Sequence, residues 1–231
     1  HEIPLQYRID GHPVLGDPLR MKGAKLEAKM LFITCLEQHV SDIVSAVEEA
    51  GIDVLDATAA PIAAAMVTLT KTQRIAGCVL ANIGAETVSL VVYENGVPIS
   101  LEVFPIGSTD ITNDIALGLK IPLEEAESLK TGASGSESFS KRKLDEIIKA
   151  RLSDMFDLIE AHLKSIHRNG LLPAGIIITG GGSGIGEIED LARSLLDLPA
   201  SIGQTRIAAK SSREIPDATW AVAYGLCLWG M

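Results

Sequence analysis

The chain has 231 residues, of which 47% are hydrophobic and 22% charged, a composition that excludes wholesale disorder, a collagen and a disulfide-stabilised miniprotein. This length suits one large domain or two small ones. Lys and Arg together number 20 against 30 Asp and Glu, a formal net charge of -10, so the chain lacks the basic surplus that binds long nucleic acids. With only 4% aromatic residues to stack on bases, no nucleic-acid partner is expected.

Cysteine usage and hydropathy favour a cytoplasmic location. The 3 cysteines are far apart and form no CxxC pair, so neither a disulfide framework nor a zinc ribbon is indicated. No run of 18 apolar residues could span a bilayer, and the first residues lack the basic and apolar regions of a signal peptide. Because the sequence begins with His1 rather than Met, we expect a fragment of a longer protein.

The first third of the chain predicts alternating strands and helices. An apolar run at residues 30–34 predicts a strand, and residues 53–57 predict a second one. Between them, apolar residues three and four positions apart predict an amphipathic helix that Gly51 ends: Val40, Ile43, Val44 and Val47. Pro61 and the small residues after it predict the start of another helix.

The clearest local pattern predicts three consecutive antiparallel strands. Their apolar segments are residues 78–83, 87–93 and 97–104. Asn95-Gly96, between the second and third segments, is typical of a tight hairpin.

Helices dominate the predicted structure after this hairpin. Helices are expected at residues 109–118 and 122–130, followed by a flexible Gly/Ser-rich loop at 131–140. A long core-facing helix over residues 141–168 is predicted by an apolar stripe: Leu144, Ile148, Leu152, Met155, Ile159, Leu163 and Ile166. The last helix, residues 217–228, is apolar on most faces, so we expect it to be buried.

A glycine-rich turn is the first candidate binding site. It joins a predicted strand at residues 174–179 to a predicted helix at residues 185–196, and it contains Gly180, Gly181, Gly182 and Ser183. Strand, glycine turn and helix in this order favour a phosphate or nucleotide cradle, although the spacing fits neither a Rossmann fingerprint nor a P-loop. A tight turn that needs glycine only for its backbone conformation explains the pattern equally well.

Two further candidates allow a functional and a structural interpretation. Asn82, Gly84 and Thr87 lie where a strand ends in a turn, which could contact phosphate or could be an ordinary hairpin. Glu127 and Lys130 share one helical face and could hold ribose hydroxyls or form a surface ion pair. The chain contains no HExxH or GxSxG motif, and its acidic clusters are explained by helix capping.

The order of these elements resembles the FtsA family of bacterial cell-division proteins, in the actin and heat-shock-chaperone ATPase superfamily. Residues 1–29 carry the most specific likeness, to the second half of the extra subdomain of that family. Further likenesses are residues 82–87 to the second phosphate motif, Glu127 with Lys130 to the ribose-contacting helix, and residues 179–183 to the adenosine motif. The resemblance implies an α/β, actin-like (ribonuclease H-like) ATPase fold with the extra subdomain partly present.

The resemblance also implies a division of the chain into subdomains. Residues 1–34 would be the second half of subdomain 1C and residues 35–75 the remainder of 1A. Residues 76–120 and 170–231 would form the nucleotide-binding subdomain 2A, and residues 121–169 a shortened 2B. The first phosphate loop and the C-terminal membrane helix of the family have no counterpart here.

The implied ligand is ATP with Mg²⁺. The resemblance implies that Asn82, Gly84 and Thr87 contact the phosphates and that Glu127 and Lys130 contact the ribose. It implies that the adenosine is contacted by the glycine turn: Gly180, Gly181, Gly182 and Ser183. The family has Asp where Asn82 stands, and an amide lacks the charge that a carboxylate offers to hydrated magnesium. We therefore expect ATP binding in the complete protein with slow hydrolysis at most.

The implied function is that of a cell-division adaptor at the inner face of the cell membrane. Such a protein polymerises, tethers the FtsZ ring to the membrane through a C-terminal helix, and recruits later divisome proteins through 1C. Arg151 and Asp154 match positions that contact the FtsZ C-terminal tail, although a solvated helix face explains them as well. The alternatives are an actin-like scaffold of type IV pilus assembly and, from another class, a small-molecule kinase of this fold.

Overall fold

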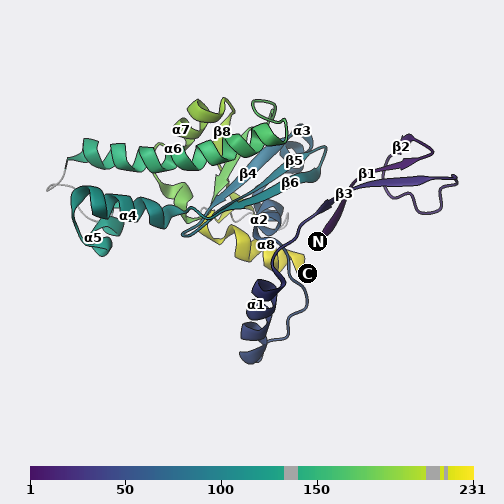
Figure 1. Cartoon of the computed structure of the whole chain (residues 1–231), viewed down its shortest axis with the longest axis horizontal. Helices are drawn as coiled ribbons and strands as arrows, with labels where there is room; N and C mark the ends of the chain where they lie inside the picture. The colour runs from purple at the N-terminus through teal and green to yellow at the C-terminus, as the bar shows by residue number, and fades with distance from the viewer. Residues whose placement is uncertain (133–139, 207–213, 216–217) are drawn as a thin grey trace.

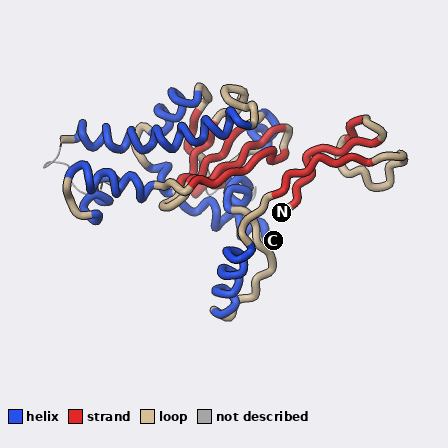
Figure 2. Tube along the Cα trace, viewed as in Figure 1, coloured by secondary structure: helices blue, strands red, loops and turns tan. Residues whose placement is uncertain are grey.

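The computed structural model describes residues 1–132, 140–206, 214–215 and 218–231. The chain forms a body built on a five-stranded sheet, from which a smaller N-terminal sheet and one helix project (Figures 1 and 2). Among the described helices, none combines the length and the apolar character needed to cross a membrane.

The central sheet is mixed, with the order β6-β5-β4-β7-β8. Its strands are β4 (Cys78–Ile83), β5 (Val88–Glu94), β6 (Val97–Phe104), β7 (Ile176–Thr179) and β8 (Ala200–Ile202). The first three are antiparallel, which confirms the predicted meander, whereas β7 and β8 run parallel to β4. Asn95 and Gly96 both have positive φ, 54° and 84°, as a tight type I′ hairpin requires.

Helices cover both faces of this sheet (Figure 1). One face carries α4 (Ser108–Leu119), α6 (Lys141–Ser165) and α7 (Ile188–Leu196), and α5 (Leu123–Lys130) packs beside α4. The other face carries α2 (Ala60–Thr68) and α8 (Ala221–Trp229), with the short α3 (Lys71–Ala76) following α2. Successive β4 side chains therefore serve two cores, Val79 and Ala81 on one face and Leu80 on the other.

The long helix α6 confirms the apolar stripe read from the sequence. Its fully buried side chains are Leu152, Met155, Phe156, Ile159 and Leu163, at most 1% exposed, and Leu144 is 7% exposed. The helix ends at Ser165, three residues before the predicted limit.

The N-terminal arm is a separate antiparallel sheet with the order β2-β1-β3. Its strands are β1 (Glu2–Ile9), β2 (His12–Val14) and β3 (Leu26–Phe32), so the strand predicted at residues 30–34 begins earlier than expected. Helix α1 (Glu37–Glu49) follows where the apolar spacing predicted a helix, but none of its residues is buried.

Two predictions are wrong and one lies outside the described residues. Residues 53–57 form no strand, since none of the described strands pairs with them. Helix α8 is buried only where Ala221 and Gly225 face α2; Leu226 and Trp229, on its other side, are 45% and 42% exposed. Most of the predicted loop at 131–140 falls outside the described part of the chain.

Candidate functional site

The carboxyl ends of β4 and β7 bring two predicted site segments into contact. The strands are parallel neighbours with Asn82 opposite Thr179, so the end of β4 and the turn that follows β7 lie side by side. A Cβ atom on Gly180 would stand 2.4 Å from Asn82 Oδ1 and 2.5 Å from the Ile83 carbonyl oxygen. The Gly180 amide donates to the Ala218 carbonyl at 3.2 Å, which anchors the turn to the segment before α8.

The glycines of this turn serve two different purposes. Gly180 has a φ of +88° and Gly182 would place a Cβ 2.4 Å from Ile83 Cγ2, so both are required by backbone conformation or packing. Gly181 and Gly184 would place a Cβ in open space, with nothing within 4 Å. These two positions present bare backbone that a flat ligand could approach, so the structural and the functional interpretations apply to different glycines.

The turn is stabilised by its own internal hydrogen bonds. Residues 181–184 form a short 3₁₀ helix, η2 (Gly181–Gly184). Ser183 is buried, and its hydroxyl donates to the Gly180 carbonyl at 2.7 Å. Ser183 therefore shapes the cradle, and its hydroxyl is already engaged.

The turn between β4 and β5 is fastened to the start of α4. The Gly84 amide donates to the Thr87 carbonyl at 2.9 Å, as in an ordinary hairpin. The amides of Ser108 and Thr109 donate to the Gly84 and Ala85 carbonyls, each at 2.9 Å. Since these helix N–H groups are occupied, a phosphate at this turn would depend on the turn itself, where the Thr87 side chain is exposed.

Glu127 and Lys130 belong to a compact polar network on α4 and α5. The Lys130 ammonium contacts Glu127 Oε2 at 2.7 Å, Thr112 Oγ1 at 2.8 Å and the Ser108 carbonyl at 3.1 Å, which uses all three of its donors. The Thr112 hydroxyl in turn donates to Glu127. Neither Thr112 nor Ser108 was predicted to contribute here, because the pairing joins two separate helices.

Exposure divides the roles of this pair. Only 7% of the Lys130 side chain is exposed, against 51% of the Glu127 side chain. Burial acts to raise the pKa of Glu127, but hydrogen bonds from Lys130 and Thr112 outweigh it and hold the pKa below its usual value. Glu127 is thus a fixed, ionised acceptor suited to a hydroxyl donor, and Lys130 is the residue that orients it.

One cavity of about 580 Å³ connects Lys130 with the far end of the glycine turn. Its walls also include Asp145 and Lys149 of α6, and Glu187 at the start of α7. Lys149 forms an ion pair with Glu187, so the cavity is lined by charged groups beside the open backbone of Gly184. This arrangement suits a polar ligand with hydroxyl and heterocyclic groups.

The site fits a nucleotide better than it fits a metal held by the protein. Open glycine backbone and the fixed Glu127 carboxylate are suited to a base and a ribose. At the phosphate end Asn82 contributes a neutral amide, and within the described ranges no group of three His, Cys, Asp or Glu side chains could hold a metal ion. Among the described residues, the side chains therefore form no magnesium site of their own.

Arg151, predicted to contact a partner, is engaged within the molecule. Its guanidinium donates to both carboxylate oxygens of Asp114 on α4, at 2.7 and 3.0 Å, and lies 3.3 Å from Asp154. Only 29% of its side chain is exposed, whereas 60% of the Asp154 side chain is. Arg151 thus joins α6 to α4, while Asp154 faces solvent.

The chain has the fold of the actin-like ATPases. It is similar to the solved PilM-PilN type IV pilus biogenesis complex, with a TM-score of 0.76 and 19% identity over 100% of this chain and 66% of that one. It is also similar to EutJ of Carboxydothermus hydrogenoformans, with a TM-score of 0.65 and 19% identity over 85% of this chain and 62% of that one. MreB5 of Spiroplasma citri bound to ADP gives a TM-score of 0.66 and 17% identity over 85% and 65%.

Within this class the chain belongs to the FtsA family. The family described as Cell division protein FtsA matches residues 79–225. FtsA of Pseudomonas aeruginosa is 27% identical over 252 residues, which cover 100% of this chain and 60% of the relative. FtsA of Bacillus subtilis is 28% identical over 245 residues, covering 97% of this chain and 54% of the relative. The 231 residues thus span little more than half the length of these relatives.

Proposed function

We propose that this chain is the nucleotide-binding part of a cell-division adaptor of the FtsA type. Such an adaptor binds ATP, self-associates into filaments, and tethers the FtsZ ring to the inner face of the cell membrane at the division site. It recruits later divisome proteins through the N-terminal arm, which corresponds to subdomain 1C. Membership of the FtsA family is the observation that carries this proposal.

The geometry of the cleft supports the nucleotide part of the proposal. Asn82 at the end of β4, with Gly84 and Thr87 in the turn that follows, would contact the phosphates. Glu127, which is oriented by Lys130, would accept hydrogen bonds from the ribose hydroxyls. The adenosine would lie against the turn that follows β7: Gly180, Gly181, Gly182 and Ser183. Since no carboxylate stands at position 82, we propose ATP binding with slow hydrolysis at most.

Subdomain 2B supplies the surface that we propose for the FtsZ tail. Arg151 is already neutralised by Asp114 and Asp154, so it offers little charge to an acidic peptide. The basic start of α6, at Lys141 and Lys143, is the better source of attraction. In this view Asp154 borders the surface, and Arg151 supports it by fixing α6 against α4.

Titration of a fluorescent FtsZ C-terminal tail peptide against the chain tests the adaptor function. We expect saturable binding that weakens between low and physiological salt, because exposed charges are screened. Replacing Lys141 and Lys143 by Gln should weaken binding, and Lys71→Gln on α3 is the matched control. Absence of binding to the cognate tail at low salt would refute the adaptor proposal.

A pilus-assembly scaffold is the second candidate. It is favoured by the likeness to the PilM-PilN complex, which covers 100% of this chain. A PilN-type peptide that binds in place of the FtsZ tail would move the assignment to that class. Phosphoryl transfer from ATP to a sugar would instead indicate the small-molecule kinase.

A further inference from the structure

The turn after β4, where the nucleotide phosphates are proposed to lie, carries an acidic side chain. Glu86 is exposed in this turn, and its carboxylate accepts a hydrogen bond from the Thr109 hydroxyl at 3.3 Å, which keeps it beside the start of α4. At the end of β4, Asn82 offers a neutral amide. A phosphate at this turn would therefore meet a like charge rather than an opposite one.

The start of α4 lies against this turn, but its own backbone donors are already used. A helix N-terminus often binds phosphate through its first N–H groups. Here the Gly107 amide donates to Asp110 Oδ2 at 2.8 Å, and the Asp110 amide donates to the Gly107 carbonyl at 3.1 Å. The two amides between them donate to carbonyls of the turn, each at 2.9 Å. The Asp110 carboxylate thus takes the place of an anionic ligand at this helix end.

The neighbouring cations are engaged as well. The Lys130 ammonium reaches the Ser108 carbonyl at 3.1 Å, but its other two donors contact side chains of α4 and α5. The Arg151 guanidinium is neutralised by Asp114 and Asp154. Neither cation has charge to spare for a phosphate at the turn.

Two backbone donors remain at this turn. The amides of residues 85 and 86 have no hydrogen-bond acceptor within the described structure. Each could contact a phosphate oxygen, but both are neutral and bring no charge to offset that of Glu86. Attraction and repulsion at the turn therefore oppose each other, so the number of phosphates should matter little to the affinity.

The ribose and base end of the site has the opposite character. The Glu127 carboxylate, held by Lys130, is a fixed acceptor for hydroxyl groups, and a cavity of about 580 Å³ opens beside it. That cavity is lined mainly by α5, α6 and residues 184–187, whereas the turn after β4 contributes none of its described lining residues. The space and the fixed polar contacts thus lie where a nucleoside would bind.

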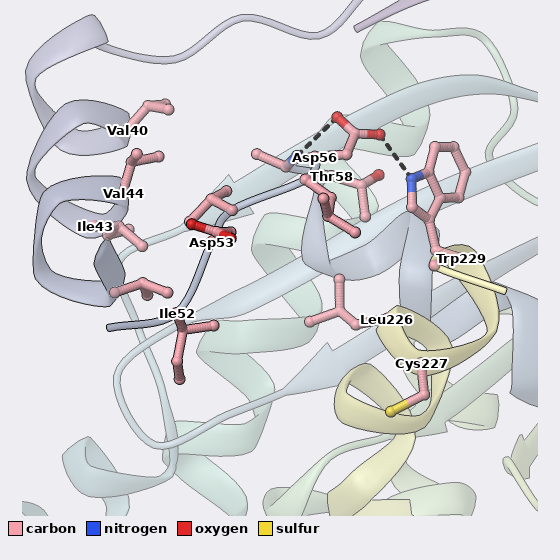
Figure 3. Close-up of a pocket in the computed structure, with 15 residues that line it drawn as sticks. Val40, Ile43, Val44, Ile52, Asp53, Asp56, Thr58, Leu226, Cys227 and Trp229 are labelled. Carbon is pink, nitrogen blue, oxygen red and sulfur yellow. Dashed lines mark hydrogen bonds between the residues drawn. The ribbon is translucent and has the colours of Figure 1, made fainter. Parts of the chain in front are cut away.

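A larger groove elsewhere in the molecule offers the phosphates no better place. It lies between α1 and the end of α8, has a volume of about 750 Å³, and shares no described lining residue with the cavity beside Glu127 (Figure 3). The charged side chains on its described lining are Asp53 and Asp56, and Asp56 accepts a hydrogen bond from the Trp229 indole N–H at 2.9 Å. This groove is therefore acidic and apolar, not cationic.

On the nucleotide site proposed above, we infer that this chain recognises the nucleoside part of its ligand and is indifferent to magnesium and to the third phosphate. A magnesium ion bound with a nucleotide usually contacts one or two protein carboxylates besides the phosphates. Asn82 provides none, and Glu86, already bonded to Thr109, belongs to no group of three possible metal ligands within the described ranges. ATP and ADP then bind with similar affinity, and ligands that bind alike cannot shift an equilibrium between two conformations differently. The nucleotide is a structural ligand of this part of the protein rather than a switch.

Competition binding tests this inference on the complete 231-residue chain. A fluorescent adenosine analogue is displaced by adenosine, ADP or ATP, each with excess Mg²⁺ or with EDTA. We expect the three dissociation constants to agree within about threefold, and Mg²⁺ to change that of ATP less than twofold. Glu86→Gln should strengthen ATP binding about threefold at low salt and leave adenosine binding unchanged, because it removes one charge beside the phosphates. Glu48→Gln, which removes the same charge on α1, is the matched control and should change neither.

Three results would overturn the inference. The first is ATP binding at least tenfold tighter than that of adenosine, because the phosphates would then be recognised. The second is ATP binding that Mg²⁺ strengthens at least fivefold; if Glu86→Gln abolished that gain, Glu86 would be a magnesium ligand. The third is an equal effect of Glu86→Gln and Glu48→Gln on ATP binding. Failure of adenosine, ADP and ATP alike to bind would instead refute the proposed nucleotide site, on which the inference rests.

Discussion

The amphipathic helices α6 and α1 differ in how much of their apolar face is buried. Helix α6 buries six side chains against the central sheet, whereas α1 buries none. More broadly, none of residues 1–60 is buried, while both hydrophobic cores begin after them. An apolar stripe therefore predicts a helix in both places, but it does not predict that a partner surface lies within the same chain.

This difference indicates how the chain divides energetically. The body after residue 60 contains its own cores and a five-stranded sheet, so it has the burial that cooperative folding needs. The arm and α1 are held by local hydrogen bonds and by contacts such as Trp229 with Asp56. We expect the body to set the global stability and the region before it to open locally.

The largest effect should come from truncating the α6 core. Phe156 is fully buried, so Phe156→Ala should cost about 3–5 kcal/mol of unfolding free energy through lost burial and a cavity. Ile43→Ala on α1 should cost less than about 1 kcal/mol. Urea unfolding followed by circular dichroism measures both, and comparable losses would mean that α1 is covered in solution.

Two neighbouring glycines provide the next largest contrast. Gly180→Ala would force a Cβ against Asn82 and Ile83 at a φ of +88°, so it should destabilise the protein by about 1–3 kcal/mol. Gly181→Ala meets open space and should leave stability within about 0.5 kcal/mol of the parent. If a nucleotide lies against Gly181, Gly181→Ala should bind a fluorescent ATP analogue at least tenfold more weakly than the parent does, even though its stability is unchanged.

A control variant far from the glycine turn distinguishes an effect on nucleotide binding from a general effect on the protein. Gly230→Ala, at the end of α8, places its Cβ at ordinary van der Waals distance and should alter neither stability nor nucleotide affinity. Should Gly181→Ala bind the analogue as tightly as Gly230→Ala does, the nucleotide does not lie on that backbone. The glycine turn would then have only a structural purpose.

Much of the fold could be predicted because its signals are local. The Asn95-Gly96 hairpin, the α6 stripe and the strand before the glycine turn each depend on residues close in sequence. The prediction of a strand at residues 53–57 was wrong because a strand needs a pairing partner, and none of the described strands pairs with this segment. The prediction that α8 is buried was wrong for a related reason, since apolar composition does not predict which faces of a helix are covered.

The sequence proposes which residue types form the candidate site, but it does not predict the contacts between them. The ion pair of Arg151 with Asp114 joins residues 37 positions apart, and the hydrogen bond of Lys130 with Thr112 joins residues 18 apart. No periodicity relates such positions, since their contact depends on how two helices pack. The partner contact of Arg151 was implied by the family resemblance and stays a prediction; the structure adds that Arg151 joins α4 and α6.

The Arg151–Asp114 pair should give a smaller, measurable coupling. The contact is bidentate and both side chains are about 70% buried, so a double-mutant cycle with Arg151→Met and Asp114→Leu should yield about 1 kcal/mol. A coupling near zero would mean that solvent screens the pair. Arg151 would then be free to contact a partner.

The smallest effect concerns pH. His162 Nε2 lies 2.8 Å from the Ser100 hydroxyl with 10% of its side chain exposed, and burial lowers its pKa below 6.5 despite Glu102 at 3.7 Å. The folded state therefore disfavours the charged imidazole, so this contribution to stability is complete above pH 6.5 and is lost as the pH falls from there toward the lower pKa of the folded state. His162→Gln should flatten this fall in unfolding free energy between pH 7 and pH 5, whereas His12→Gln, on the exposed arm, should not. If the unfolding free energy of both variants falls with pH as steeply as that of the parent, another group causes the pH dependence. Protonation of His162 would then not weaken the contact of α6 with β6.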